Sequence, residues 1–456
     1  MVRFDDSLPT FASLVTQYLG PEALRDNLFL RDISGKLTFI LLALSPTDDR
    51  KALLMLQAEQ ELGAYVDKDG FCVSTPDQLF DDSLKTLDSA RRVSILHAKF
   101  DGQVWLVDRR FVGADWLRPA ELPAKGPARF VFASMKGGVG RSTALCVLAS
   151  HLASSGQRVL CIDLDMESPG LGNMLLTPET LPRFGLLDFF AEQLANPLDE
   201  AFYVDMVGSS WLTGQTGRLD VIPALGRSSI EFPENVLSKL ARAYLAGADS
   251  NAGGQTFADH LRRVVGRFSE DTKYDAILVD ARAGLHETTA AALTGLGAEI
   301  LLFGIDEPQT FAAFELLFAS LASGRGMVDG EWREHLQIVQ AKAPPIAKKR
   351  TAFSDRVEEL QRKYFWPSPS PPSAVPDLVG LSQTFEVEWT KENENEEAVE
   401  SMLQEPDLSC IAILEDERFH GFDPVSNGDV LSDALYDSSF RAFLLTAKRS
   451  LPGDQS

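Results

Sequence analysis

Between residues 129 and 345, short, wholly apolar runs alternate with longer segments whose apolar residues recur at helical spacing. Such runs are typical of strands buried on both faces of a sheet. Strands that alternate with helices favour parallel pairing through right-handed crossovers. We therefore predict an α/β domain with a doubly wound, mostly parallel sheet. Its strands are expected at 130–133, 158–164, 219–224, 276–279, 298–305 and 336–341, and its main helices at 144–153, 236–246, 257–268 and 311–321.

Residues 1–121 follow another pattern, in which helical segments and β-hairpins are mixed. The first hairpin is centred on Ser34-Gly35, and Asp101-Gly102 is the predicted turn of the second. Together they indicate a small α+β domain, in which no group of catalytic residue types stands out. Residues 122–128 hold two prolines and a glycine and are the predicted linker. The helices and hairpins are expected at 9–19, 29–44, 48–65 and 93–109.

Residues 346–456 are expected to complete the α/β domain. A proline-rich connector at 366–376 and a solvated acidic segment at 386–407 precede a short strand, 411–414. The terminal helix, 438–449, carries only Arg441, Lys448 and Arg449 as basic residues. Because it lacks a dense basic face, we expect it to pack on the core rather than on lipid.

Composition narrows the class of protein. The chain has 456 residues, and its formal net charge of −23 argues against a protein that binds polyanions over its whole surface. The four cysteines are scattered without a C-x-x-C pair, which is typical of free thiols in a reducing compartment. No signal sequence and no apolar stretch of membrane-spanning length is apparent. We therefore expect a cytoplasmic protein without stable membrane insertion.

The strongest chemical signal is the glycine-rich segment between the first predicted strand and helix of the α/β domain. Residues without Cβ atoms let a loop curl its N–H groups around an anion, and the positive end of the following helix favours the same place. The Ser142 hydroxyl is positioned to hold Mg²⁺. The candidate phosphate-binding residues are Lys136, Gly137, Gly138, Val139, Gly140, Arg141, Ser142 and Thr143.

A second signal lies in the segment 274–284, YDAILVDARAG, where an apolar strand ends in Asp280. In doubly wound folds the carboxyl ends of the strands form the ligand site. Asp280 would then hold the hydration shell of Mg²⁺. Gly284, four residues later, would let the backbone approach the terminal phosphate.

The segment K-G-G-V-G-R-S resembles the deviant Walker A box, K-G-G-x-G-K-[ST], of the MinD/ParA family of dimeric ATPases, with Arg141 in place of the final lysine. The resemblance implies a homodimer that forms around ATP and Mg²⁺, with Lys136 reaching the partner's nucleotide. It also implies that Asp165 positions the attacking water and that Asp163 supports the metal. Residues 167–171 would form switch I, and Gln340 would contact the adenine. The resemblance covers roughly residues 129–345.

Three functions remain open at this stage. The first is a switch ATPase acting through an unidentified protein partner, with residues 1–121 as the adaptor. The second is a DNA-partition ATPase that binds DNA through Lys348, Lys349 and Arg350, although a solvated helix with pairs Glu358–Arg362 and Glu359–Lys363 explains this basic segment as well. The third is a nucleotide-binding module with weak or no hydrolysis, for which Arg141 is the motive, because the arginine fork is wider and more rigid than lysine.

Overall fold

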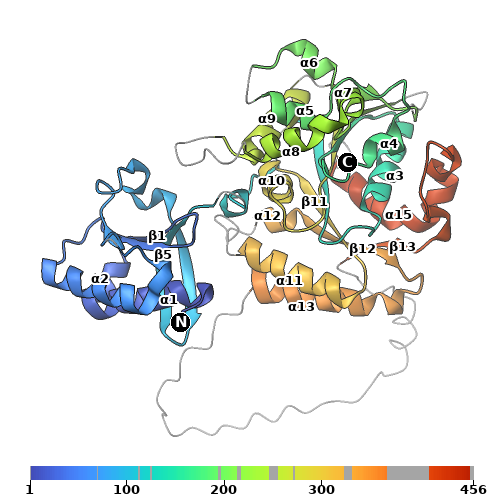
Figure 1. Cartoon of the computed structure of the whole chain (residues 1–456). Helices are drawn as coiled ribbons and strands as arrows, with labels where there is room; N and C mark the ends of the chain where they lie inside the picture. The colour runs from blue at the N-terminus through green and yellow to red at the C-terminus, as the bar shows by residue number, and fades with distance from the viewer. Residues whose placement is uncertain are drawn as a thin grey trace, which may run out of the picture. The chain divides into compact units, whose positions relative to one another are not determined.

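The computed structural model describes residues 2–68, 70–110, 113–123, 126–193, 197–212, 217–245, 255–270, 273–322, 331–366 and 410–451. The chain divides into two compact units, the first built on Met1–Pro119 and the second beginning at Ala120 (Figure 1). The expected proline-rich connector (apart from Trp366) and acidic segment lie outside the described residues.

The N-terminal unit contains a five-stranded mixed sheet of strand order β3-β2-β1-β5-β4. The expected first hairpin is present, because β1 and β2 pair antiparallel. Helices α1 and α2 carry apolar side chains that join those of the sheet in one core, with Phe11, Phe29 and Phe39 fully buried. The elements are α1 (Phe4–Leu19), β1 (Leu28–Arg31), β2 (Leu37–Ile40), α2 (Asp48–Leu62), β3 (Val73–Ser74), β4 (Arg91–His97) and β5 (Phe100–Asp108).

The second hairpin is also present, but its predicted Asp-Gly turn is wrong. His97 pairs directly with Phe100, so the chain turns at residues 98 and 99, and Gly102 lies inside β5 opposite Ile95. The Phe100 ring covers Gly102, and a Cβ added there would come within 3.0 Å of it. The absence of a side chain at Gly102 therefore allows an aromatic ring to approach the strand, and the glycine does not form a turn.

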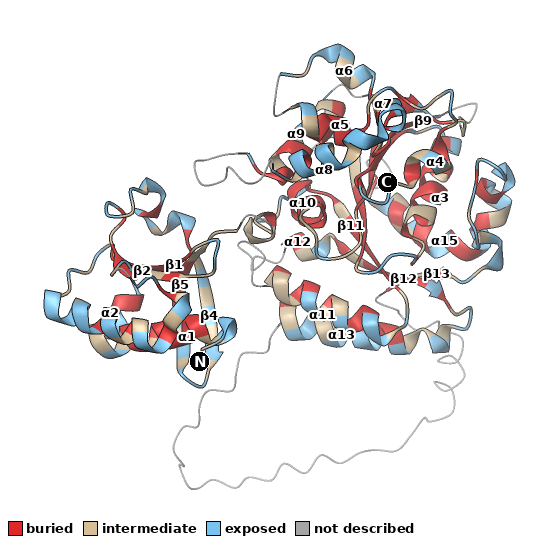
Figure 2. Cartoon of the chain, in the orientation of Figure 1, coloured by how far each residue is buried: buried red, intermediate tan, exposed pale blue. Residues whose placement is uncertain are grey.

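The second unit is built on an eight-stranded sheet of order β13-β12-β11-β6-β10-β7-β9-β8, parallel except for the short edge strand β8. The predicted α/β fold class is thereby confirmed. The central strands are almost wholly buried, as expected for a sheet covered on both faces (Figure 2). The strands are β6 (Ala128–Ser134), β7 (Arg158–Asp163), β8 (Gly208–Ser209), β9 (Arg218–Ile222), β10 (Ala276–Asp280), β11 (Glu299–Gly304), β12 (Leu336–Ala343) and β13 (Ile411–Leu414).

Helices cover both faces of this sheet. On one face, α3, α4 and α15 pack against the strands, and their side chains form one apolar cluster with Phe132 and Phe303. On the other face lie α10, α11 and α13 (Figure 1). The helices of this unit are α3 (Arg141–Ser154), α4 (Leu171–Leu175), α5 (Leu186–Glu192), α6 (Glu200–Val204), α7 (Arg227–Glu231), α8 (Val236–Leu245), α9 (Phe257–Ser269), α10 (Glu287–Gly295), α11 (Pro308–Ala322), α12 (Glu331–Glu334), α13 (Thr351–Phe365) and α15 (Asp433–Arg449).

The C-terminal segment is part of this core. Strand β13 extends the parallel sheet beside β12, and α15 buries Tyr436, Phe440 and Phe443 against the sheet and α3. The helix begins at Asp433, five residues earlier than expected. Among the described residues, no helix is both long and apolar enough to cross a membrane.

The basic helix α13 packs beside α11, which changes one expected ion pair. Arg362 does pair with Glu358, at 3.0 Å. Lys363, however, pairs with Glu315 of α11 at 2.5 Å, and not with Glu359. The neighbouring helix thus offers Lys363 a closer carboxylate than its own helix does.

Candidate functional site

The glycine-rich segment forms an open loop between β6 and α3, at the carboxyl edge of the sheet. Gly138 and Gly140 have φ angles of +74° and +89°, a region that favours glycine. A Cβ added at Gly137, Gly138 or Gly140 would meet no atom within 4 Å, so the space over these residues is open. Helix α3 starts at Arg141, and the N–H groups of its first turn have no acceptor within the helix. The loop and the helix end therefore offer several backbone donors to one anion.

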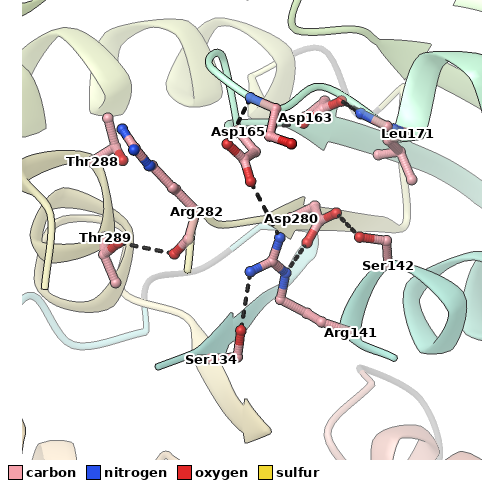
Figure 3. A network of polar contacts seen from close by, with 12 residues as sticks. Ser134, Arg141, Ser142, Asp163, Asp165, Leu171, Asp280, Arg282, Thr288 and Thr289 are labelled. Carbon is pink, nitrogen blue, oxygen red and sulfur yellow. Dashed lines mark hydrogen bonds and ion pairs between the residues drawn. The ribbon is translucent and has the colours of Figure 1, made fainter. Parts of the chain in front are cut away.

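Beside this loop, side chains from the end of β6, the start of α3 and the end of β10 meet (Figure 3). The Ser142 hydroxyl donates a hydrogen bond of 2.5 Å to Oδ2 of Asp280. The guanidinium of Arg141 pairs through Nε with Oδ1 of the same carboxylate and donates through Nη1 to the Ser134 hydroxyl at 3.1 Å. Strand β10, which lies next to β6 in the sheet, brings Asp280 to this point.

The two carboxylates that follow β7 occupy different environments. Asp163 is buried, and its oxygens accept hydrogen bonds from the backbone N–H groups of Asp165, Gly170 and Leu171 at 3.0–3.1 Å. Asp163 thereby fixes the loop that leads to α4. Asp165 is less buried, and its carboxylate lies 3.7 Å from Nη2 of Arg141.

Burial of these acids has an electrostatic consequence. Burial, together with the nearby charge of Asp280, raises the pKa of Asp163 to about 7, in spite of its three backbone donors. Burial also raises the pKa of Asp165, although Arg141 opposes the shift. Asp165 and Asp280 thus share one guanidinium, with the Asp163 carboxyl close to Asp280, and the region would be stabilised by a further cation.

The residues present fit Mg²⁺ bound together with phosphate groups. Ser142 and Asp280 supply a hydroxyl and a carboxylate oxygen at one point, and Mg²⁺ commonly binds one or two protein oxygens plus phosphates and water. Within the described ranges, no group of three or more His, Cys, Asp or Glu side chains could hold a metal by itself.

Lys136, the early lysine of the loop, is engaged within its own chain. Its Nζ lies 2.6 Å from Glu307 and 3.3 Å from the Gln309 side-chain oxygen, both of which follow β11. The pair is about half exposed, with side-chain exposures of 45% and 44%. An exposed pair of this kind contributes little stability and can exchange partners readily.

Gly284 and Gln340 occupy different positions relative to the loop. The Gly284 N–H donates to the carbonyl of Ser134, at the end of β6, over 2.9 Å, and its φ of +92° favours glycine. The Gln340 side chain is buried within β12, and its Nε2 has no hydrogen-bond partner among the described residues. The expected roles of both residues stay predictions.

A pocket adjoins the phosphate loop on the side of β12 and β13. Lys342, with a φ of +50°, lies at a bulge of β12 and donates from Nζ to the Gly138 carbonyl at 3.1 Å. Gln340 is not among the lining residues, whereas its neighbours Ala341 and Lys342 are. The lining consists of Val139, Gly140, Thr143, Ala341, Lys342, Ile413, Leu414, Glu415, Asp416, Phe419, His420 and Phe440.

Sequence reasoning missed the C-terminal wall of this pocket and gave no role to Arg282. Nothing in the residues 410–440 marks them as neighbours of the glycine loop, because their place depends on β13 pairing with β12. Arg282 carried a usable signal, since it is a cation two residues after the acid of an apolar strand.

The parallel sheet, the glycine loop between β6 and α3, and the acid at the end of the neighbouring strand β10 together define a P-loop nucleotide-binding domain. The segment that carries β6, the loop, α3 and β7, residues 129–173, matches the family model described as an AAA domain. The early lysine of the loop, Lys136, is the residue on which the resemblance to the MinD/ParA family rests.

Solved structures of similar proteins include the MinD cell division protein of Aquifex aeolicus, at 16% identity and a TM-score of 0.38, covering 71% of this chain and 95% of that one. The Pyrococcus furiosus cell division ATPase MinD has 20% identity and a TM-score of 0.38, with 71% and 98% covered. A variant of Cyanothece McdA in complex with ATP has 14% identity and a TM-score of 0.41, with 72% and 97% covered. No curated protein matches the chain. At these scores the likeness carries no information about the site.

Proposed function

We propose that this protein binds Mg·ATP at the loop of residues 136–143 and hydrolyses it slowly, as a dimerising switch that acts on a protein partner. The observation that carries the proposal is the meeting of Ser142, Arg141 and Asp280 beside an open glycine loop. Ser142 and Asp280 are 138 residues apart in sequence, so their direct hydrogen bond is a product of the fold.

In this proposal, each residue has a separate task. The backbone N–H groups of Gly138, Gly140 and the first turn of α3 bind the β- and γ-phosphates, and Arg141 neutralises part of their charge. Ser142 and Asp280 hold Mg²⁺, which supplies further neutralisation of the phosphate oxygens when it is bound. Asp165 orients the attacking water, and Asp163 keeps the loop of Asp165 in place through its backbone hydrogen bonds. Hydrolysis then depends mainly on positioning and charge neutralisation.

The nucleobase occupies the pocket between the loop and β13. The pocket lies beside Val139 and Thr143, which supports this assignment, because the ribose connects the base to the phosphates and so keeps the base next to the loop. Aromatic side chains, Phe419 and Phe440, contribute to its apolar wall. Base selectivity would follow from the backbone and side chains of residues 413–420 and not from Gln340 alone.

Dimer formation is coupled to the nucleotide through Lys136. The exposed pair with Glu307 keeps the lysine near the loop without burying it. On dimerisation, Lys136 exchanges Glu307 for the partner's phosphates. The N-terminal unit, with its own core, is the part that a protein partner would recognise.

The proposal is tested by nucleotide binding with the full chain. Ser142→Ala and Asp280→Asn should each weaken Mg²⁺-dependent ATP binding by about tenfold or more, which corresponds to about 1.4 kcal/mol. Asp275→Asn is a matched control, since Asp275 precedes the same strand β10 at its opposite end and pairs with Arg158. Equal ATP affinity for the wild type and both site variants would refute the proposal.

Hydrolysis needs its own measurement, because it distinguishes a switch ATPase from a nucleotide-binding module with weak or no hydrolysis. Steady-state phosphate release should be detectable for the wild type and absent for Asp165→Ala. Tight ATP binding by the wild type without phosphate release would leave a nucleotide-binding module with lost hydrolysis.

The DNA-binding alternative has weaker support in the contacts of the basic segment. Arg350 donates to the carbonyls of Pro344 and Pro345, and Lys363 pairs with Glu315. Within the described part of the chain, Lys348 and Lys349 have no ion-pair partner, so two lysines remain for a phosphate backbone. A gel shift that appears with ATP and disappears on neutralising Lys348 and Lys349 would favour this function.

A further inference from the structure

A second cationic side chain lies next to the site and takes no part in the contacts described above. Arg282 follows Asp280 by two residues and forms an ion pair through Nη1 with Glu167, in the loop after β7. Glu167 also accepts a hydrogen bond of 3.0 Å from the hydroxyl of Tyr244, on α8. The carboxylate of Glu167 thus links two loops of the site and one helix.

The backbone of Arg282 is fixed by neighbouring hydrogen bonds, and its side chain is paired with Glu167. Its carbonyl accepts a hydrogen bond of 2.9 Å from Thr289, and Gly284, two residues later, is bound to Ser134 at the start of the phosphate loop. The guanidinium is paired with Glu167, which is itself about one-third exposed. A partly exposed pair of this kind can exchange one partner for another anion.

The Arg282 side chain lies close to the carboxylates of the candidate site. Figure 3 shows Arg282 beside Asp165, with its guanidinium extending away from Asp280 and Ser142. The two residues also interact electrostatically, since Arg282 is one of the charges that lower the pKa of Asp165. Arg141 is already shared between Asp280 and Asp165. Arg282 is a further guanidinium near these carboxylates, and the carboxylate that holds it is that of Glu167.

We propose that Arg282 is a ligand of the terminal phosphate of the nucleotide, which Glu167 holds away from the site until a triphosphate binds. This inference rests on the proposed nucleotide-binding function. On binding, the guanidinium exchanges the Glu167 carboxylate for the γ-phosphate. Glu167 and Tyr244 are then released, so that α8 responds to the triphosphate and not to the diphosphate.

A purely structural ion pair makes a different prediction. If the pair only holds two loops together, removing either partner perturbs the same loops. Both variants should then weaken the binding of both nucleotides to the same extent. If Glu167 competes with the phosphate for Arg282, the two removals act in opposite directions. The comparison of two single variants with two nucleotides therefore separates the two roles.

The experiment measures the affinity of the full chain for Mg·ADP and for a non-hydrolysable Mg·ATP analogue. Arg282→Gln should weaken the analogue by about tenfold or more and change ADP binding by less than about twofold, because one charge-assisted contact is lost only with the triphosphate. Glu167→Gln should strengthen the analogue by about threefold and leave ADP binding unchanged. Arg158→Gln is the matched control, since it breaks an Arg–Asp pair at the opposite end of β7.

A second measurement does not depend on affinity. In hydrogen–deuterium exchange, amides of residues 236–245 should exchange faster with the analogue than with ADP in the wild type, and equally in Arg282→Gln. An unchanged ratio of analogue to ADP affinity in Arg282→Gln, with a thermal melt like that of the wild type, would overturn the inference. Wild-type protein that binds neither nucleotide would instead refute the proposed function on which it rests.

Discussion

The hydroxyl of Ser142 donates to the carboxylate of Asp280 over 2.5 Å, from the first turn of α3 to the end of β10. This contact requires that β10 lie directly beside β6. Only in that strand order does the end of β10 face α3, the helix that follows β6. It also requires the helix to begin within the glycine loop. This single hydrogen bond therefore depends on the strand order, on the glycine loop and on the residue at which the helix starts.

Arg141 should contribute to stability even without nucleotide. Replacing it by Met leaves Asp165 and Asp280 without the cation with which they pair, and loss of one partner of a buried ion pair costs about 3 kcal/mol. Arg141→Lys keeps the charge but not the fork and should cost about 1 kcal/mol. Urea unfolding at pH 7 with EDTA measures both. The control is Arg158→Met, which breaks an exposed pair. Equal stability of Arg141→Met and this control would contradict the assignment.

Lys136 and Glu307 should have opposite effects on dimerisation. Lys136→Ala removes the proposed contact with the partner's phosphates, so ATP-dependent dimers should disappear. Glu307→Gln removes the carboxylate that holds the lysine at 2.6 Å, so dimers should form at about threefold lower ATP concentration. Light scattering with ATP follows both effects, with each change placed in the non-hydrolysing Asp165→Ala variant. Dimers of Lys136→Ala that equal those of the wild type would exclude this lysine from the interface.

Asp416 should make the stability of the protein depend on pH in the acid range. Hydrogen bonds from Arg418 and Ser439 hold the pKa of its carboxyl well below its ordinary value. A depressed pKa stabilises the folded state above the unfolded pKa of about 4, and this contribution is lost as pH falls through the folded pKa.

The matching variant is Asp416→Asn, expected to be about 1 kcal/mol less stable than the wild type at pH 7. The difference should shrink as the pH is lowered below about 4. Urea midpoints at pH 7, 5 and 3.5 give the comparison, and Asp423→Asn, exposed in the same segment, should show a smaller difference. A gap that stays constant over this range would argue against an ionised, hydrogen-bonded Asp416.

Lys342 should support the phosphate loop from the side of the pocket. Its Nζ donates to the Gly138 carbonyl at 3.1 Å, and its backbone adopts a φ of +50°, which is unusual outside glycine. Lys342→Met removes the donor and keeps the length of the side chain, so ATP affinity should fall by about threefold. Lys348→Met, an exposed lysine six residues on, should leave the affinity unchanged. Fluorescent-nucleotide titration separates the two variants.

Local patterns were enough to predict the sheet and to single out two residues that meet at its carboxyl edge. Asp280 was predictable because an apolar run ended in an acid, and Ser142 because it followed the glycine loop. The same patterns failed where a tertiary contact decided the outcome. Gly102 lies under the ring of Phe100 and not in a turn, and Lys363 pairs with Glu315 of another helix.

The pocket wall could not be read from the sequence for a related reason. Asp416, Phe419 and Phe440 reach the phosphate loop only because β13 pairs with β12 after an intervening segment of the chain. Nothing in their spacing points to a nucleotide. Arg282 was visible in the sequence, but its partner Glu167 follows a different strand, so the pair became apparent only in the structure.

The order of the elements along the chain also determines when this pocket can first form. During translation, the phosphate loop emerges long before β13 and Phe440, although these complete the same pocket. A nascent chain that has not yet passed residue 440 therefore carries the glycine loop without this wall of the pocket. Under the proposed function, tight nucleotide binding should first appear after the ribosome has translated α15.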